Sequence, residues 1–464
     1  MRPNEPGPPA RPPEAWAPAH RLARAFVAPV ERFLAVEAAS GVLLLLAAVL
    51  ALVWANSPWR DVYEALWSVP LGARLGDLSF ERDLRWWVND GLMTVFFFVV
   101  GLEIRREIHR GELSDLRRAA LPIAAAVGGM VVPALLYVAL NAGGPSAAGW
   151  GVPMATDIAF AVGVLALLGD RVAPALRILL LSLAVIDDLG AILVIAVVYS
   201  GGVDPIALGV AGAGLASIVA LQRLGARAPA LYLPGALVAW AGAYASGVHP
   251  TIAGVAVGLL TPVRAWLGPA QLAAAAEVAA VAARARGDDD GEDLDASVGP
   301  LRHAVRESVS PVERLQHALH GWVAFLVMPV FAFANAGVAL GDADVSGEWR
   351  VFAGVFLGLF VGKPIGVLAA SRLAAAGAVA TVPRGVGWAD VSIVGLVAGI
   401  GFTMALFVAQ LAFPPGPALE TAKLAILAAS TASGVVGWAV GRAALRRDPR
   451  AARTEAEAEA TTEA

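Results

Sequence analysis

The stretch RILLLSLAVIDDLGAILVIAVVYS, residues 177–200, decides the fold of this chain. It has the length and the apolar composition of a helix that spans a membrane. Near its middle lie two adjacent acids, Asp187 and Asp188. Carboxylates at this depth are costly unless they face a water-filled cavity or a partner. The acid pair is therefore predicted to be a functional site within the membrane.

The composition of the whole chain indicates the same class of protein. Of its 464 residues, 58% are hydrophobic and 16% are charged, and the mean hydropathy is +0.69. We therefore expect an all-α membrane protein. The chain has no cysteine, which excludes disulfides and cysteine nucleophiles. Apolar runs predict about twelve transmembrane helices, near residues 34–55, 87–108, 119–140, 150–168, 177–200, 205–224, 230–247, 249–262, 319–340, 350–374, 388–412 and 420–443.

Arginine is distributed unevenly over the connections between these runs. Connections that carry it alternate with connections that have no lysine or arginine; the first kind are 105–118, 171–177, 223–227 and 372–384, and the second kind are 141–149, 201–204 and 413–419. Short loops rich in lysine and arginine face the cytoplasm. Both termini are therefore predicted to be cytoplasmic, which agrees with an even number of spans.

The predicted twelve-span domain covers residues 33–443 and lies between two tails. The tails, 1–32 and 444–464, are rich in proline or low in complexity and are predicted to be disordered. An acidic cytoplasmic insertion at about 283–300 contains GDDDGEDLD, which we interpret as a solvated linker in preference to a regulatory or cation-collecting segment. The extracytoplasmic connection 56–85 is compatible with a small hairpin.

The fourth and eleventh predicted spans are interrupted by glycine and proline. The fourth begins GWGVPMATDIAFAVG (149–163), and the eleventh reads VSIVGLVAGIGFTMALF (391–407). Broken backbone at membrane depth is tolerated only where it is buried in protein or lines a cavity. Each broken span is the middle member of a group of three, spans 3–5 and spans 10–12. This pattern predicts inverted repeats whose two broken helices cross at an ion site.

Four ionisable residues are expected to converge on that site. Asp157 lies in the fourth span, Asp187 and Asp188 in the fifth, and Lys363 in the tenth. Adjacent helix positions point about 100° apart, so one of the two neighbouring acids is expected to face the ion cavity with Asp157 and the other to pair with the lysine. Carboxylate and hydroxyl oxygens suit a small alkali cation or protons. The alternative is a structural role, in which the acids neutralise helix ends or the buried lysine.

Seven stretches, in order through all twelve spans, resemble motifs of the NhaA-type sodium/proton antiporters. They are NDGLMTVFFFVVGLEIRREI (89–108), ATDIAFAVGVLALLG (155–169), LAVIDDLGAI (183–192), GVHPTIAGVAVG (247–258), PVFAFANAGV (329–338), GKPIG (362–366) and GIGFTM (399–404). The general association of matched, interrupted spans with an ion site in transporters was itself drawn partly from this family. The resemblance implies an electrogenic exchange of Na⁺ or Li⁺ for H⁺ across a bacterial inner membrane. Such exchange serves pH and sodium homeostasis by alternating access, without a cofactor.

The resemblance also implies roles for single residues. Asp188 matches the principal cation ligand and proton carrier, and Asp187 matches the acid paired with the buried lysine, Lys363. Thr156 and Asp157 match the site in the broken helix. Na⁺ is accordingly expected to bind Asp188 and Asp157. The expected partners are the transported ions, the lipid bilayer and a second copy of the chain bound through 56–85, with no nucleic acid.

A further set of residues matches the family's entry funnel and pH response: Asp90, Glu103, Glu107, His249, Gln316, His317 and His320. Solvated helix ends commonly carry such glutamates, and a histidine can cap a short helix, so these plainer readings of Glu103, Glu107 and His249 stay open. Gln316, in VERLQHALHGW (312–322), stands where the family commonly has an acid. Because an amide does not titrate, we expect the pH profile to differ from that of the family.

Two other classes of protein also use acids within a membrane. An intramembrane aspartyl protease needs two aspartates on facing helices, typically in a GxGD setting that this sequence lacks, and a neighbouring lysine would disturb their shared proton. A cation channel needs a ring or filter of carbonyls or acids along an open path. Coupled counter-movement of sodium and protons would distinguish an exchanger from both classes.

Overall fold

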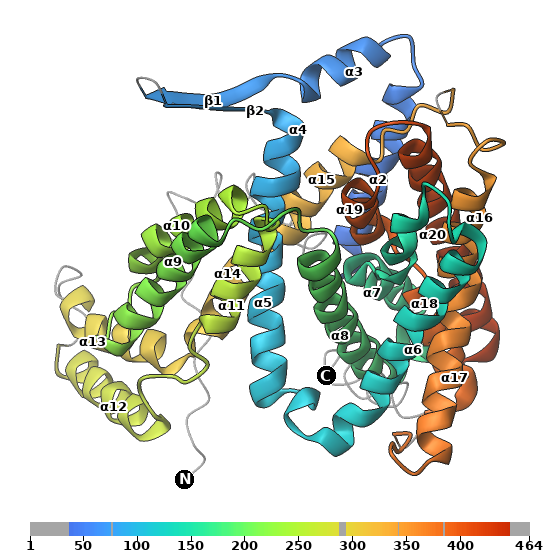
Figure 1. Ribbon diagram of the computed structural model, residues 1–464. Helices are drawn as coiled ribbons and strands as arrows, with labels where there is room; N and C mark the ends of the chain where they lie inside the picture. The colour runs from blue at the N-terminus through green and yellow to red at the C-terminus, as the bar shows by residue number, and fades with distance from the viewer. Residues whose placement is uncertain (1–36, 76–77, 287–293, 342, 384–385, 446–464) are drawn as a thin grey trace, which may run out of the picture.

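The computed structural model describes residues 37–75, 78–286, 294–341, 343–383 and 386–445. In this part of the chain the protein is a bundle of helices with one two-stranded hairpin (Figure 1). We call the end of the bundle where α2 begins and α20 ends the terminal side, and the opposite end, which carries α3 and the strands, the hairpin side. The predicted N-terminal tail, the predicted C-terminal tail beyond residue 445 and the centre of the acidic insertion lie outside the described residues.

The first part of the chain forms α2 (Glu37–Ala55), α3 (Arg60–Trp67), β1 (Pro70–Leu75), β2 (Leu78–Asp83), α4 (Leu84–Trp86), the π-helical segment η2 (Trp87–Leu92), α5 (Met93–Arg110) and η3 (Glu112–Ser114). The first three-span group consists of α6 (Leu116–Asn141), the 3-10 helix η4 (Ala147–Met154), α7 (Ile158–Ala166), η5 (Gly169–Arg171) and α8 (Pro174–Val198).

The middle of the chain forms α9 (Pro205–Arg223), η6 (Pro229–Tyr232), α10 (Leu233–Ala245), α11 (Thr251–Leu260), α12 (Pro269–Arg286), α13 (Leu294–Ser308), α14 (Pro311–Trp322), the π-helical η8 (Val323–Val327) and α15 (Met328–Asn335). The second three-span group consists of α16 (Trp349–Leu357), the π-helical η9 (Gly358–Gly362), α17 (Lys363–Ala376), α18 (Trp388–Ala398), α19 (Phe402–Ala412) and α20 (Pro417–Ala444).

A helix occupies each of the twelve predicted spans, and the prediction of an all-α membrane protein is confirmed. Among the described residues, eight helices are long and apolar enough to cross a membrane, and ten spans result if each of two bent pairs counts as one. The remaining two predicted spans are α10 and α11, which have 13 and 10 residues. They are shorter than the roughly 17 to 25 residues that cross the hydrocarbon.

Both predicted broken spans are broken, and the two breaks meet. The fourth span is η4, then extended backbone at 155–157, then α7; the eleventh bends by 50° between α18 and α19. The backbone N–H of Asp157 donates to the carbonyl of Ile400 at 2.7 Å, which joins one interruption to the other. Backbone groups that lost their helical partners are thereby satisfied across the crossing.

Small residues hold the two three-span groups together at α6 and α17. A Cβ atom added at Gly366 would lie 2.1 Å from the carbonyl oxygen of Gly128, and one added at Gly128 would lie 2.2 Å from that of Gly366. No side chain larger than hydrogen fits such a backbone approach. The contact fixes α17, and with it Lys363 at its start, against the first group.

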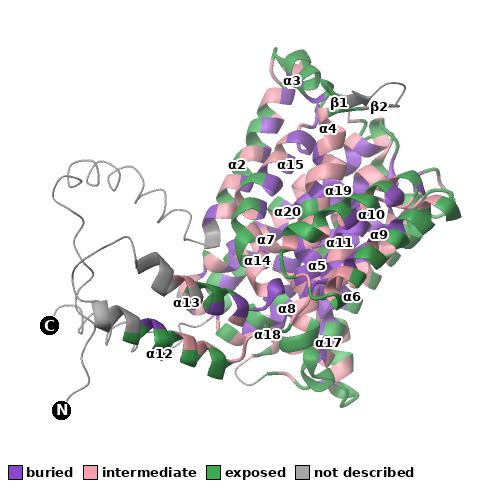
Figure 2. Cartoon of the chain, turned by 90° about the vertical axis from the view of Figure 1, so that its left-hand side faces the viewer, coloured by how far each residue is buried: buried purple, intermediate pink, exposed green. Residues whose placement is uncertain are grey.

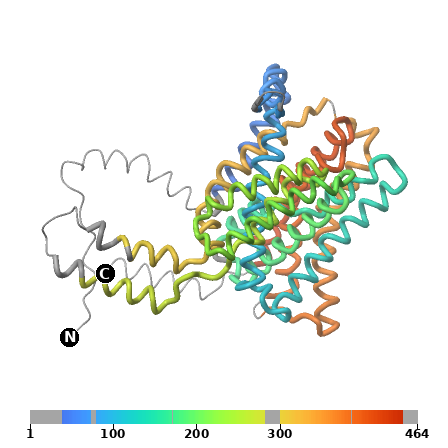
Figure 3. The backbone as a smooth tube through the Cα atoms, turned by 60° about the vertical axis from the view of Figure 1, so that its left-hand side comes forward, coloured from blue at the N-terminus to red at the C-terminus, as the bar shows by residue number. Residues whose placement is uncertain are grey.

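The hairpin at 56–85 is present, although its turn lies outside the described residues. β1 pairs with β2 in antiparallel register from Pro70 with Asp83 to Leu75 with Leu78. Before it, α3 leaves α2 at an angle of 119° and lies across the hairpin side (Figures 1 and 2). The alanine-rich helix α12 and the helix α13 flank the acidic patch and lie beside the bundle (Figure 3).

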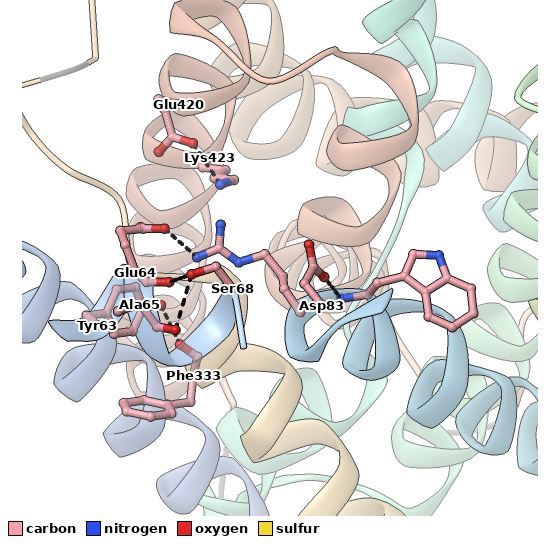
Figure 4. A network of polar contacts seen from close by, with 10 residues as sticks. Tyr63, Glu64, Ala65, Ser68, Asp83, Phe333, Glu420 and Lys423 are labelled. Atoms are coloured by element: carbon pink, nitrogen blue, oxygen red, sulfur yellow. Dashed lines mark hydrogen bonds and ion pairs between the residues drawn. The ribbon is translucent and has the colours of Figure 1, made fainter. Parts of the chain in front are cut away.

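Tyr63 anchors α3 to the bundle (Figure 4). Its hydroxyl donates to the carbonyl of Phe333 on α15 at 2.6 Å. Burial raises the pKa of Tyr63 to about 12, so the phenol remains a neutral donor at physiological pH. Arg85, which follows the hairpin, donates to Glu64 of α3 at 2.9 Å. The first contact ties the hairpin segment to the membrane bundle, and the second joins the two ends of that segment to each other.

Candidate ion site

The site is built around Asp187, whose carboxylate oxygen Oδ2 lies 2.7 Å from the Lys363 ammonium nitrogen. Neither side chain is exposed to solvent. Lys363 stands directly after the π-helical segment η9 and also donates to the carbonyl of Met154 at the end of η4. The pair therefore connects α8, α17 and the broken fourth span. This is the geometry that the sequence predicted for one of the two adjacent acids.

Thr156 lies in the extended break of the fourth span and bridges the two broken helices. Its hydroxyl lies 2.7 Å from Oδ2 of Asp187 and 3.0 Å from the carbonyl oxygen of Ala398, the last residue of α18. The other oxygen of Asp187, Oδ1, is buried and has no hydrogen-bond partner among the described residues. A buried carboxylate oxygen without a donor is costly and is available to a proton or a cation.

Asp157 joins the second halves of the two broken spans. Its Oδ1 accepts from the backbone N–H of Phe160 at 3.1 Å and so caps α7. Its Oδ2 accepts from the backbone N–H of Thr403 at 3.1 Å and from the Thr403 hydroxyl, at the start of α19. The sequence analysis noted Thr403 as part of the interrupted GIGFTM stretch but did not assign it to the site. A hydroxyl directly after paired glycines in a broken span was the available signal.

Asp188 points away from Lys363 and lines a cavity of about 500 Å³. Thr156 and Asp157 line the same cavity, as do three of the residues predicted for the entry funnel and the pH response, Glu103, Gln316 and His320. Much of the remaining wall is apolar. The sequence analysis did not assign the following residues to the site, although they line the cavity: Ser40, Phe96, Val100, Arg177, Phe325 and Met404. The cavity thus gathers acids from α5, from the break before α7 and from α8 around one space.

The other residues predicted for the pH response lie elsewhere. Glu107 accepts from the backbone N–H of Glu112 at 3.1 Å, and His317 is exposed, with its Nδ1 2.8 Å from the carbonyl oxygen of Glu313. On the hairpin side, Nε2 of His249 lies 3.5 Å from Oδ1 of Asp90. The structure thus brings Asp90 and His249 together, but in a group separate from the cavity.

The chemistry of the cavity suits protons and hard cations. Its polar lining includes three carboxylates, two hydroxyls, an amide, an imidazole and a guanidinium around one space, and the sulfur atoms present are thioethers of methionine and not thiolates. In the described part of the chain, no three His, Asp or Glu side chains are grouped closely enough to form a preformed metal cage. A cation held here would share its ligands with backbone or water oxygens, as a transported ion does.

Comparison with known proteins identifies the family. The profile of the family described as Na⁺/H⁺ antiporter 1 matches residues 31–440. The chain is 55% identical to the Na⁺/H⁺ antiporter NhaA 2 of Sorangium cellulosum over 97% of this chain and 98% of the relative. It is also 55% identical to NhaA 2 of Myxococcus xanthus, over 98% of each chain, and 49% identical to NhaA 2 of Pseudomonas putida, over 91% and 95%. The chain therefore belongs to the NhaA family of Na⁺/H⁺ antiporters, which are multi-pass membrane transporters and not enzymes.

Proposed function

We propose that this protein exchanges intracellular Na⁺ or Li⁺ for external H⁺ and so serves pH and sodium homeostasis. The observation that carries the proposal is the position of Asp188, which is buried at 2% exposure yet lines the cavity together with Asp157. Within the described residues, no side chain or backbone group donates a hydrogen bond to the Asp188 carboxylate. Its partner is accordingly expected to be the transported ion.

Exchange follows from competition at this carboxylate. A proton and a Na⁺ ion need the same oxygen atoms of Asp188, so binding of one excludes the other. Alternating access then exposes the loaded site to one side of the membrane at a time, and each ion is released where its concentration favours release. Asp157 is the expected second ligand, since it is held by Thr403 within the same cavity.

The Asp187 and Lys363 pair supplies a second place for a proton. Protonation of Asp187 would release Lys363, and two protons moved for each sodium ion would make the exchange electrogenic. The unpartnered Oδ1 of Asp187 supports this role because it is a ready acceptor next to the ion cavity. An imposed membrane potential should change the exchange rate of the wild-type protein in liposomes.

We further propose the orientation and assembly of the chain. The arginine-rich connections place the terminal side in the cytoplasm and the hairpin side outside the bacterial inner membrane. The hairpin is a two-stranded sheet with unpaired edges, which is marginal alone and offers backbone groups to a second copy of the chain. A homodimer through residues 56–85 would pair these edges.

Asp188→Asn tests the proposal. The amide keeps the shape of the side chain but carries no exchangeable charge, so sodium-dependent proton movement should fall to background. The measurement uses purified protein in liposomes with an imposed Na⁺ gradient and a pH-sensitive dye inside. Exchange above about a tenth of wild type, a loss of less than ~1.4 kcal/mol in the barrier, would contradict the assignment.

The same liposomes distinguish the other classes of function. An exchanger moves protons against the sodium gradient in a coupled way, a channel gives uncoupled sodium current, and a protease gives neither. The Asp188→Asn protein should elute from gel filtration as a single species and melt at the wild-type temperature or higher. Loss of exchange then reflects loss of the Asp188 carboxylate and not loss of the fold.

A further inference from the structure

One row of side chains on α19 runs from the ion cavity to the hairpin side of the bundle. Met404, Phe407 and Gln410 are spaced by three residues along this helix, so each is a surface neighbour of the next, about 60° further round. Met404 lines the ion cavity. The two residues beyond it are held by side chains of α5, α15 and η2, which belong to neither three-span group. This row of α19 side chains therefore closes the cavity towards the hairpin side.

Phe407 is the first layer of the closure. Its ring centroid lies 5.3 Å from that of Phe97 on α5, 5.3 Å from that of His249 and 6.1 Å from that of Phe331 on α15. Phe407, Phe97 and Phe331 are each 1% exposed or less. An aromatic cluster without accessible space leaves no path for a hydrated ion between the cavity and the hairpin side.

Three amides form the second layer, which we call the amide clasp: Asn89, Asn335 and Gln410. The Asn89 side chain donates from Nδ2 to Oε1 of Gln410 at 2.6 Å. It accepts at Oδ1 from Nδ2 of Asn335 at 2.7 Å, and Asn335 also donates to the carbonyl of Phe331 at 2.9 Å. Asn89 is therefore the centre of a bridge between η2, α15 and α19.

The two hydrogen bonds of the amide clasp differ in what they join. The bond between Asn89 and Asn335 stays within the part of the bundle outside the repeats, whereas the bond to Gln410 crosses into the second repeat. Nε2 of Gln410 is buried and has no acceptor among the described residues. A buried donor without a partner is destabilising, so the closed arrangement carries a cost at Gln410 that movement of α19 could relieve.

We propose that the amide clasp and Phe407 form the outer gate of the transport cycle, which opens when α19 moves away from η2 and α15. The proposal rests on the alternating-access exchange proposed above. The π-helical segment η2 carries Asn89, and π-helical insertions occur often at functional positions in helices. Outward release of the ion requires the bond between Asn89 and Gln410 to break, but leaves the bond between Asn89 and Asn335 intact.

Reversible cross-linking tests the gate, and the chain offers a clean background because it contains no cysteine. In the first double variant, Asn89→Cys with Gln410→Cys, the two thiols lie on opposite sides of the gate. In the matched control, Asn89→Cys with Asn335→Cys, both thiols lie on the same side. Each pair is linked in liposomes with a short bifunctional thiol reagent that a reductant cleaves. The exchange rate of each linked sample is compared with that of the same double-cysteine protein before linking. Any effect of the substitutions themselves is present in both rates and therefore cancels.

Linking positions 89 and 410 should lower Na⁺/H⁺ exchange by about tenfold or more, and reduction should restore it. Linking positions 89 and 335 should leave the exchange rate within about twofold of the unlinked sample. Exchange that survives the 89–410 link at more than a fifth of its unlinked rate, or falls equally with both links, would overturn the gate. Absence of exchange in the wild-type protein would instead refute the proposed function.

A second measurement does not depend on the cross-link. Met404→Cys places a thiol on α19 within the cavity, where a membrane-impermeant thiol reagent on the hairpin side should react slowly. Adding Gln410→Ala removes the clasp bond across the gate and should increase that reaction rate several-fold. Adding Gln222→Ala should not, because the hydrogen bond of Gln222 to the Leu260 carbonyl joins α9 to α11 and involves no residue of α19. Equal rates in all three proteins would refute the role of the clasp.

Discussion

At the scale of single residues, Asp187 and Asp188 of α8 have different environments because they are adjacent positions of one helix. Asp187 turns towards Lys363 and Thr156, while Asp188 turns towards the cavity, because neighbouring helical positions diverge by about 100°. Two carboxylates one residue apart thus acquire different surroundings. One is compensated by a buried ammonium group, and the other lines the cavity, where we propose that it binds the transported ion.

Lys363→Ala should lower the free energy of unfolding substantially. Removing one partner of a fully buried ion pair leaves a charge without compensation, which typically costs about 3–5 kcal/mol. The matched control is Arg110→Ala, which removes an exposed ion pair with Glu313 at 2.9 Å and should cost about 1 kcal/mol or less. Thermal unfolding of both variants in the same detergent measures the difference. Equal shifts in melting temperature would contradict the compensation of Asp187 by Lys363.

Gln316→Glu should change the pH dependence of exchange. Gln316 lines the ion cavity with Glu103 and His320, and its Oε1 is buried without a partner in the described residues, so a carboxyl there would titrate next to the transport site. We expect a steeper or shifted curve of activity against pH. His317→Gln is the control, since His317 is exposed and does not line the cavity. An unchanged curve for Gln316→Glu would remove this role of position 316.

At the scale of elements, glycine determines how closely α6 and α17 approach. The two helices belong to different three-span groups, and their contact at Gly128 and Gly366 sets the position of Lys363 at the beginning of α17. The start of α17 is preceded by the π-helical η9, whose wider turn shifts the register of the residues that follow. The position of the buried lysine thus depends on both features.

Gly366→Ala should destabilise the protein and reduce exchange. The added methyl group meets a carbonyl oxygen at 2.1 Å, so the helices must separate, at a cost of about 1–3 kcal/mol. Gly209→Ala is the control, because no atom lies within 4 Å of a Cβ at this helical position. Its effect should stay within about 1 kcal/mol. The melting temperatures of the two variants test this prediction. A Gly366→Ala protein as stable as the Gly209→Ala protein would show that α6 and α17 are loosely packed.

At the scale of the whole molecule, the hairpin projects from the bundle and rests on α10, where the Phe80 ring lies 5.7 Å from the Tyr244 ring and Arg82 donates to the Tyr244 hydroxyl at 3.0 Å. The backbone N–H of Leu84, after β2, donates to the carbonyl of Val69, before β1, at 3.0 Å. A short turn can therefore join these two residues in place of the strands, at the cost of the contacts to Tyr244. Figure 1 shows the strands projecting beyond the helices on the hairpin side.

On the dimerisation proposed above, replacing residues 70–83 with a short Gly-Ser turn should convert the protein from dimer to monomer. The strand edges that a second copy would pair are then absent, while the ion site is untouched. Light scattering on the detergent-purified protein measures the molar mass. Tyr63→Phe is the control, since it removes an anchor of α3 but no strand edge. An unchanged mass after removal of the strands would place any dimer contact elsewhere.

The sequence by itself determined the class of protein, the positions of the helices, the two interruptions and the acids. These features are local: a membrane span satisfies its own backbone hydrogen bonds, so composition and length suffice to predict it, and glycine and proline predict where it breaks. A buried charge is also visible in the sequence, since its cost requires a function or a partner. The family resemblance added the roles of Asp188 and Lys363 as expectations.

The tertiary structure alone decided which groups meet. The bonds from Thr403 to Asp157 and from Asn89 to Gln410 join residues 246 and 321 positions apart, and no local pattern specifies such pairs. The same holds for the π-helical segments and for the short helices α10 and α11, whose form depends on the neighbours that pack against them. Contacts of this kind arise from the packing of whole helices, because each depends on the crossing angle and register of elements that the sequence specifies only one at a time.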